Sequence, residues 1–175
     1  DAASNRGQRG YTSFGREHAK GSTAPDLKEF WHVGQQHEAR RTLPDNYPEN
    51  MWPLEVPGFM PVMLDIFRKL EDCALVLLEA CARYIGIEPN RLRDIAIDGN
   101  SILRLINYPP IPEDRNPNSI RAGAHEDINL ITLLIEATDS GLEILGRDGK
   151  WLPVVTPKDC IIVDAGDMLQ NITNG

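Results

Sequence analysis

The clearest pattern in the chain is a series of apolar side chains at three- and four-residue steps between residues 59 and 84. This period places them on one face of an α-helix. The series comprises Phe59, Met63, Ile66, Leu70, Cys73, Leu77, Cys81 and Tyr84. Pro61 suits the first turn of such a helix, and Gly86 suits its C-terminal cap. The pattern therefore predicts a long amphipathic helix, followed by a shorter helix over Pro89–Ile97.

After residue 100 the pattern changes to short apolar, β-prone runs that are separated by turn residues. The predicted strands lie at Ser101–Tyr108, within Ala122–Ile135, and at Gly141–Leu145, Trp151–Val155 and Cys160–Val163. Asp148-Gly149 is a strong signal for a hairpin turn. Asp164 and Asp167 flank Gly166 and are interpreted as turn residues. Before residue 58 there is little periodicity, and one strand is expected near Lys28–Val33.

Helices followed by short strands predict an α+β fold whose β part is a sandwich or a barrel-like sheet. A length of 175 residues suits one ordinary domain. Within it we expect three regions. Residues 1–57 form an irregular segment that packs on the core, residues 58–100 form a helical support, and residues 101–175 form the β region.

Composition narrows the range of functions. Hydrophobic residues make up 41% and charged residues 25%, as in soluble globular proteins. A net charge of −8 argues against binding to nucleic acid or to an anionic membrane surface. No apolar run reaches membrane-spanning length. The 3 cysteines have no CxxC spacing, which suits a reducing compartment, so we expect a cytoplasmic protein with neither nucleic acid nor membrane as a partner.

The candidate chemistry lies at His125-Glu126-Asp127, just before an apolar run. In an extended chain, residues two apart point to the same face, so His125 and Asp127 can reach one ion. Two imidazoles and one carboxylate form the ligand set of non-haem Fe(II) oxygenases. An isolated His-x-Asp pattern is weak, and a surface or core role is the alternative. Glu126 is interpreted as a solvated charge.

Further motifs follow one another in a fixed order around this pair. They are Tyr108-Pro-Pro, Arg121-Ala-Gly-Ala-His125-Glu-Asp127, Thr132-Leu-Leu, Gly141-Leu-Glu-Ile-Leu, Asp148-Gly-Lys-Trp151, Gly166-Asp-Met-Leu-Gln and Thr173-Asn-Gly175. This order resembles the iron(II)/2-oxoglutarate-dependent dioxygenases of the isopenicillin-N-synthase-like branch. The resemblance is close over Arg93–Gly175. It is looser over Gly10–Gly34, where it rests on Gly10-Tyr11 and Asp26-Leu-Lys-Glu29-Phe-Trp.

The resemblance implies a double-stranded β-helix, or jelly roll, preceded by the long helix. It implies that His125 and Asp127 bind Fe(II) and that Tyr108 lies near the carboxylate of the co-substrate or substrate. No catalytic residue beyond the metal ligands is implied. The implied reaction couples oxidative decarboxylation of 2-oxoglutarate to the oxidation of a small organic substrate by O2.

The chain departs from the family pattern in two ways. Ile106 stands where family members often carry an Asn that holds the co-substrate, and Asn107, one residue away, is given no role. The family's distal histidine and its 2-oxoglutarate-binding arginine would follow Thr173-Asn-Gly175. We therefore expect an internal piece of a longer enzyme, with an incomplete jelly roll and no activity by itself.

Three further histidines and one arginine are possible supplements to this pair. His32 follows the family-like Lys-Glu-Phe-Trp stretch and is a candidate for direct contact with metal or substrate. His18 and His37 are interpreted as surface residues. Arg121 is a candidate anion ligand by its position alone.

Two other functions remain open at this point. One is a jelly-roll binding module with a vestigial metal site. The other is an iron oxidase that uses O2 without 2-oxoglutarate, as isopenicillin N synthase does. Fold resemblance alone does not distinguish them from the dioxygenase.

Overall fold

The computed structural model describes residues 7–19, 23–36, 47–97, 99–135 and 139–175. Its helices and antiparallel sheets confirm the α+β class. Contacts divide the chain into two compact units, residues 1–125 and residues 126–175. Over the ranges described, no helix is long and apolar enough to span a membrane.

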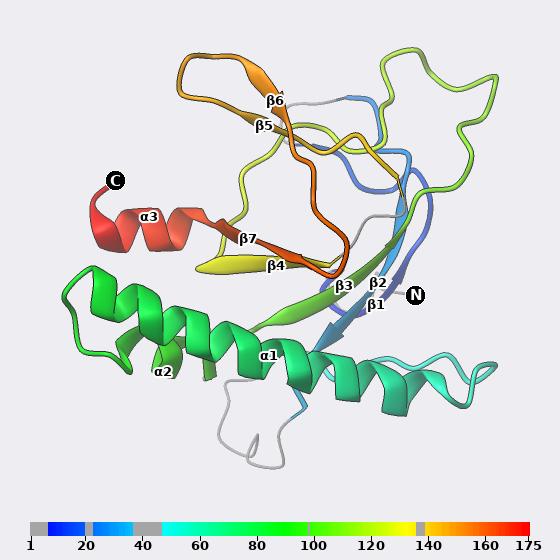
Figure 1. The fold of residues 1–175 in the computed structure, drawn as a ribbon. Helices are drawn as coiled ribbons and strands as arrows, with labels where there is room; N and C mark the ends of the chain where they lie inside the picture. Colours follow the sequence, from blue (N-terminus) through cyan, green and yellow to red (C-terminus); the bar gives the residue numbers. More distant parts are fainter. Residues whose placement is uncertain (1–6, 20–22, 37–46, 98, 136–138) are drawn as a thin grey trace. The chain divides into compact units, whose positions relative to one another are not determined.

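The first unit is built on a three-stranded antiparallel sheet with the order β1-β2-β3 (Figure 1). Its strands are β1 (Gly10–Thr12), β2 (Glu29–Gly34) and β3 (Ile102–Asn107). The strand predicted near Lys28–Val33 is confirmed as β2, whereas β1 was not predicted. The sheet thus joins strands on either side of the long helix in the sequence, and β2 lies between the other two.

The long helix α1 (Phe59–Tyr84) is confirmed with the predicted bounds. It ends where Gly86 adopts a φ of +76°, a conformation that glycine adopts readily. Its buried residues are Met63, Phe67, Leu78 and Ala82. Met63 and Phe67 pack against Val33 of β2, so this end of α1 covers one face of the sheet (Figure 1). The shorter helix α2 (Arg91–Ile97) is also confirmed and buries Leu92.

The predicted apolar face of α1 is only partly correct. Cys73 is exposed, and the side chain of Tyr84 is 92% exposed. The buried positions near the C-terminal end are Leu78 and Ala82, each one residue after the predicted Leu77 and Cys81. A series of three- and four-residue steps fits several neighbouring stripes of a long helix, and the packing partners decide which stripe is buried.

The second unit contains two antiparallel strand pairs and a short helix. β4 (Ile131–Ile135) pairs with β7 (Ile161–Ala165), and β5 (Glu143–Leu145) pairs with β6 (Trp151–Pro153). The helix α3 (Asp167–Thr173) follows β7. The hairpin predicted at Asp148-Gly149 is confirmed, since Gly149 has a φ of +77° and its amide donates to the Gly146 carbonyl at 2.9 Å.

Two details of this unit differ from the sequence prediction. Asp164 belongs to β7 and Asp167 begins α3, so they do not share a turn; only Gly166 separates the two elements. The strand expected within Ala122–Ile135 is shorter than that range and begins at Ile131. The His125-x-Asp127 segment therefore precedes the strand. It does not have the paired, extended backbone of a sheet that the prediction took as its basis.

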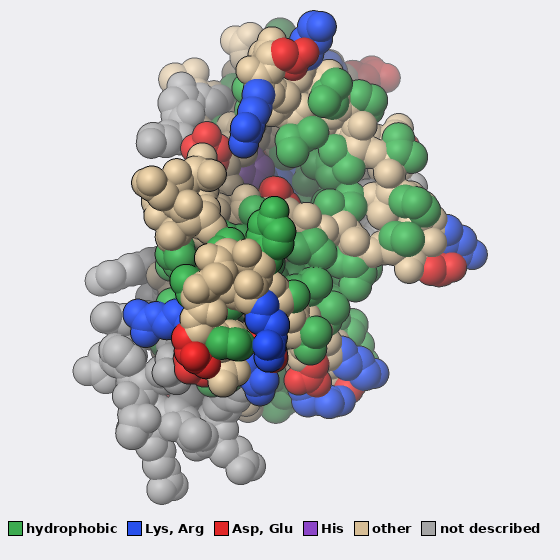
Figure 2. Space-filling model, turned by 60° about the vertical axis from the view of Figure 1, so that its left-hand side comes forward, with side chains coloured by type: hydrophobic (Ala, Val, Ile, Leu, Met, Phe, Trp, Pro, Cys, Tyr) green, Lys and Arg blue, Asp and Glu red, His purple; other side chains and the backbone are tan. Residues whose placement is uncertain are grey.

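Hydrophobic side chains are exposed on several strands of the second unit. They include Ile144, Leu145, Trp151, Leu152, Ile161 and Val163, each with at least 42% exposure. Figure 2 shows many hydrophobic side chains open to the surface on the face drawn. Such apolar surface is typical of strands that pack against a further layer. The complete jelly roll stays a prediction.

Candidate functional site

His125 is exposed, and its ring is oriented by a neighbouring carbonyl. The imidazole Nδ1 lies 2.8 Å from the carbonyl oxygen of Gly123. A carbonyl oxygen only accepts hydrogen bonds, so Nδ1 carries the hydrogen and donates it. In this tautomer Nε2 is the unprotonated nitrogen. An imidazole whose other nitrogen donates to a backbone carbonyl is the usual form of a metal-binding histidine, so His125 suits that role.

Asp127 is half-buried, and a hydroxyl group fixes its carboxylate. The Thr132 hydroxyl donates a hydrogen bond to Asp127 Oδ2. The same hydroxyl accepts a hydrogen bond of 2.8 Å from Asn129 Nδ2. If the Asn129 amide were flipped, its oxygen and Asp127 Oδ2 would both need the single hydroxyl hydrogen of Thr132. The amide nitrogen of Asn129 therefore faces the hydroxyl. Carboxylates that bind metal ions are commonly oriented by a hydrogen bond of this kind.

The backbone around Asp127 is held by the start of α3. The amides of Asp167 and Met168 donate to the carbonyls of Asp127 and Asn129 at 2.9 and 3.0 Å, and the Gly166 amide donates to the Leu130 carbonyl at 3.1 Å. A Cβ atom at Gly166 would lie 2.3 Å from Asn129 Oδ1 and 2.7 Å from the Asp127 carbonyl oxygen. The loop therefore lies so close to position 166 that only glycine, which has no Cβ atom, fits there.

Sequence reasoning missed the supports of Asp127. Thr132 appeared only as a member of a family-like motif, Gly166 only in such a motif and in a predicted turn, and Asn129 was given no role. One signal was present, since Asn129 and Thr132 are the only polar residues between Ile128 and Ile135. Polar side chains in an apolar run need hydrogen-bond partners, and here they are partners of each other and of Asp127.

The contribution of Thr132 can be measured. Thr132→Val keeps the shape of the side chain but removes the donor to Asp127, so we expect Mn(II) affinity of the full-length protein to fall about 10-fold. Thr132→Ser retains the hydroxyl and should bind Mn(II) within about 3-fold of the wild type. Isothermal titration calorimetry gives both affinities. Equal affinities for the valine and serine variants would contradict this role of Thr132.

Tyr108 lies beside Arg121 in the first unit. The Arg121 guanidinium donates to the carbonyl oxygens of Tyr108 at 3.2 Å and Pro109 at 3.3 Å. Its central carbon lies 5.8 Å from the centre of the Tyr108 ring. Tyr108 is 42% exposed. Arg121 thus stabilises the backbone turn after β3, and the structure gives it this role beside its predicted role as an anion ligand.

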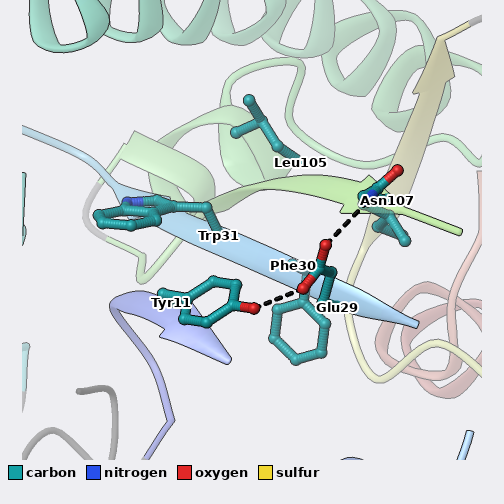
Figure 3. Close-up of a pocket in the computed structure, with 7 residues that line it drawn as sticks. Tyr11, Glu29, Phe30, Trp31, Leu105 and Asn107 are labelled. Atoms are coloured by element: carbon teal, nitrogen blue, oxygen red, sulfur yellow. Dashed lines mark hydrogen bonds between the residues drawn. The ribbon is translucent and has the colours of Figure 1, made fainter. Parts of the chain in front are cut away.

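Asn107 takes part in a different group of residues. Its side-chain amide donates to Glu29 Oε1 at 2.8 Å, and the Tyr11 hydroxyl donates to Glu29 Oε2 (Figure 3). These hydrogen bonds lower the pKa of the Glu29 carboxyl, and the bond to Glu29 raises the pKa of Tyr11. With Trp31, the three residues line a small pocket on the sheet. They join all three strands of the first unit at one end.

His32 lies on β2 with both ring nitrogens engaged. Nδ1 lies 2.9 Å from the Gly7 carbonyl oxygen, and Arg104 Nε donates to Nε2 at 2.6 Å. Burial, together with the positive charge of Arg104, lowers the pKa of His32 to about 4. His32 is therefore a neutral core residue, and the structure does not support its direct contact with a metal. His18 is exposed as predicted, and His37 lies outside the described residues.

The low pKa of His32 predicts a pH-dependent stability. Between pH 6.5 and pH 4 an unfolded His32 binds a proton that the folded one does not, so stability falls as the pH drops. The expected loss is about 2–3 kcal/mol. Urea unfolding at pH 7 and pH 4.5 measures it. His32→Gln should lessen this loss, whereas the exposed control His18→Gln should not; an equal loss in all three proteins would contradict the assignment.

Over the part of the chain that the structure describes, no three His, Cys, Asp or Glu side chains form a metal-binding group. His125 and Asp127 are thus two ligand candidates, each prepared within its own unit. Residues 99–175, which contain both, match the description "2OG-Fe(II) oxygenase superfamily". Residues 99–175 belong to the 2OG-Fe(II) oxygenase superfamily. The family predicted from the ordered motifs is thereby confirmed, while the narrower branch stays a prediction.

Several known proteins match almost the whole chain. "Proline hydroxylase buaE" of Petromyces alliaceus is 33% identical over 177 residues, which cover 95% of this chain and 53% of that protein. A 2OG-Fe(II) oxygenase family protein of Caulobacter crescentus is 45% identical, with a TM-score of 0.82 over 96% of this chain and 54% of that one. A Neurospora crassa protein, solved in complex with alpha-KG and thymine, is 30% identical, with a TM-score of 0.76 over 95% of this chain and 53% of that one.

The extent of these matches limits what they say. The chain spans about half the length of the relatives that it matches. The matches cover 95–96% of this chain, and so they extend through the first unit as well as residues 99–175.

Proposed function

We propose that the full-length protein is an Fe(II)- and 2-oxoglutarate-dependent dioxygenase in which His125 and Asp127 bind the metal. The observation that carries the proposal is the local preparation of both side chains inside the matched family segment. Gly123 sets the tautomer of His125, and Thr132 engages one oxygen of Asp127. Hydrogen bonds that orient a histidine and a carboxylate in this way are typical of metal ligands.

When bound, Fe(II) supplies the redox chemistry that couples decarboxylation of 2-oxoglutarate to oxidation of a small organic substrate by O2. The residues of this chain hold and orient it. His125 would offer a ring nitrogen to the metal, and Asp127 would offer a carboxylate. Tyr108, exposed beside Arg121, is proposed to contact a carboxylate of the co-substrate or substrate.

The proposal includes a jelly-roll core for the full-length protein, in which residues 101–175 form the first part, residues 58–100 form a helical support and residues 1–57 pack on the core. A second imidazole would complete the ligand set of such an iron site. The relatives' descriptions, a proline hydroxylase and a protein solved with thymine, favour a small organic molecule as substrate. We propose a cytoplasmic location, with neither nucleic acid nor membrane as partner.

Metal-dependent binding of 2-oxoglutarate tests this function. In calorimetry without O2, the full-length protein loaded with Mn(II) is expected to bind 2-oxoglutarate, and the metal-free protein is not. Binding of equal strength with and without Mn(II) would contradict the proposed site. The absence of binding, together with O2 consumption by the Fe(II)-loaded protein, would favour the oxidase that does not use 2-oxoglutarate.

A further inference from the structure

The loop before His125 is attached to a segment almost 100 residues earlier in the chain. The Leu27 amide donates to the Ile120 carbonyl at 2.8 Å, and the Gly123 amide donates to Asp26 Oδ1 at 3.0 Å. Gly123 is also the residue whose carbonyl oxygen accepts the hydrogen bond from His125 Nδ1. One residue, Gly123, therefore links the Asp26 carboxylate to the imidazole of His125.

The Asp26 carboxylate is itself held on both sides. It is buried, at 4% exposure, and its Oδ2 lies 3.0 Å from Lys28 Nζ. Lys28 is buried to the same extent and lies 2.7 Å from Glu17 Oε2. Burial opposes the charge of Lys28, but its hydrogen bonds to Glu17 and Asp26 outweigh that effect and raise its pKa. Buried charges that are paired in this way have little freedom to move, because separating them is costly.

Position 123 has room only for glycine. A Cβ atom there would lie 2.4 Å from Ala19 Cβ and 3.4 Å from Asp26 Oδ1. The loop can approach the Asp26 carboxylate because it carries no side chain at this point. This close approach brings the Gly123 amide within hydrogen-bond distance of a charged acceptor, which makes a stronger bond than a neutral one.

We propose that Asp26, fixed by Lys28 and Glu17, is a positioning residue that holds the Gly123 carbonyl in place for His125 and so sets the metal affinity of that imidazole. The inference rests on the proposed function, since it requires His125 to bind a metal. It assigns a role to the Asp26-Leu-Lys stretch, which resemblance alone left without one. Asp26 acts through Gly123 and does not itself touch the metal.

The test compares Mn(II) affinities by calorimetry in the full-length protein. Asp26→Ala removes the acceptor and should weaken Mn(II) binding about 10-fold. Asp26→Asn keeps an oxygen that accepts the same hydrogen bond, so it should bind within about 3-fold of the wild type. Asp65→Ala is the control, since Asp65 is an exposed acid paired with Lys69 on α1. It should leave the affinity unchanged. If Asp26→Ala does not fold, Asp26→Ser replaces it, because its shorter side chain does not reach the Gly123 amide.

A second readout follows the imidazole without any metal. Nitrogen NMR of the metal-free wild type should show His125 with its hydrogen on Nδ1, and the folded Asp26 variant without the acceptor should show a mixture of tautomers. An unchanged tautomer and unchanged Mn(II) affinity in that variant would overturn the inference. In that case His125→Ala distinguishes failure of the proposed function from failure of the role of Asp26. If His125→Ala also leaves Mn(II) affinity unchanged, the proposed function fails. If it abolishes Mn(II) binding, only the role of Asp26 fails.

Discussion

Gly166→Ala is expected to lower the free energy of unfolding by about 3 kcal/mol or more. The added methyl group would lie 2.5 Å from the Asn129 carbonyl oxygen and 2.7 Å from that of Asp127. Both are backbone atoms, so relief requires the loop to move away from α3. That movement would break the hydrogen bonds that the first amides of α3 donate to the loop, and it would displace Asp127.

Urea unfolding measures this effect, with Gly58→Ala as a matched control. Gly58 precedes α1 as Gly166 precedes α3, and neither has a side-chain cap. A Cβ atom at Gly58 would meet no atom within 4 Å. Loss of helix-cap preference alone should cost at most about 1 kcal/mol at either position. Equal destabilisation by the two substitutions would show that the close approach at Gly166 is not important.

Asp127→Ala is expected to weaken Mn(II) binding by the full-length protein more than about 100-fold. The reason is that it removes a charged ligand, whereas changes to groups that only support a ligand cost about 10–100-fold. Glu126→Ala is the control, because it removes the same charge from the adjacent, exposed residue. Calorimetry should find its affinity close to that of the wild type. Similar Mn(II) affinities for the two alanine variants would mean that Asp127 acts at most through its charge and is not a ligand.

Local sequence patterns predicted the elements of this fold well. The period of α1, the turn residues of the β5–β6 hairpin and the β-prone runs of β2, β3 and β7 each depend on neighbours within a few residues. The buried face of α1 was predicted less well, because it depends on the packing partners Val33, Leu103 and Leu105. Those partners lie on strands that precede and follow the helix.

The candidate ligands could be predicted, but their supports could not. His125 and Asp127 form a recognisable short motif, whereas Asp26 and Gly123 are 97 residues apart in the sequence. Nothing in a local pattern indicates that a buried carboxylate will meet a particular backbone amide. The same holds for Gly166, whose closeness to Asn129 arises only when α3 meets the loop before β4. His32 shows the converse, since its family-like surroundings suggested chemistry and the structure places it in the core.

The central claim is that the full-length protein turns over 2-oxoglutarate at an iron held by His125 and Asp127. Succinate formation under air, with added Fe(II), ascorbate and a panel of small substrates that includes free proline and thymine, tests it most directly. The wild type is expected to form succinate slowly alone and faster with its substrate, and His125→Ala is expected to form none. Iron-loaded wild type that forms no succinate with any substrate, or a folded His125→Ala variant as active as the wild type, would contradict the account.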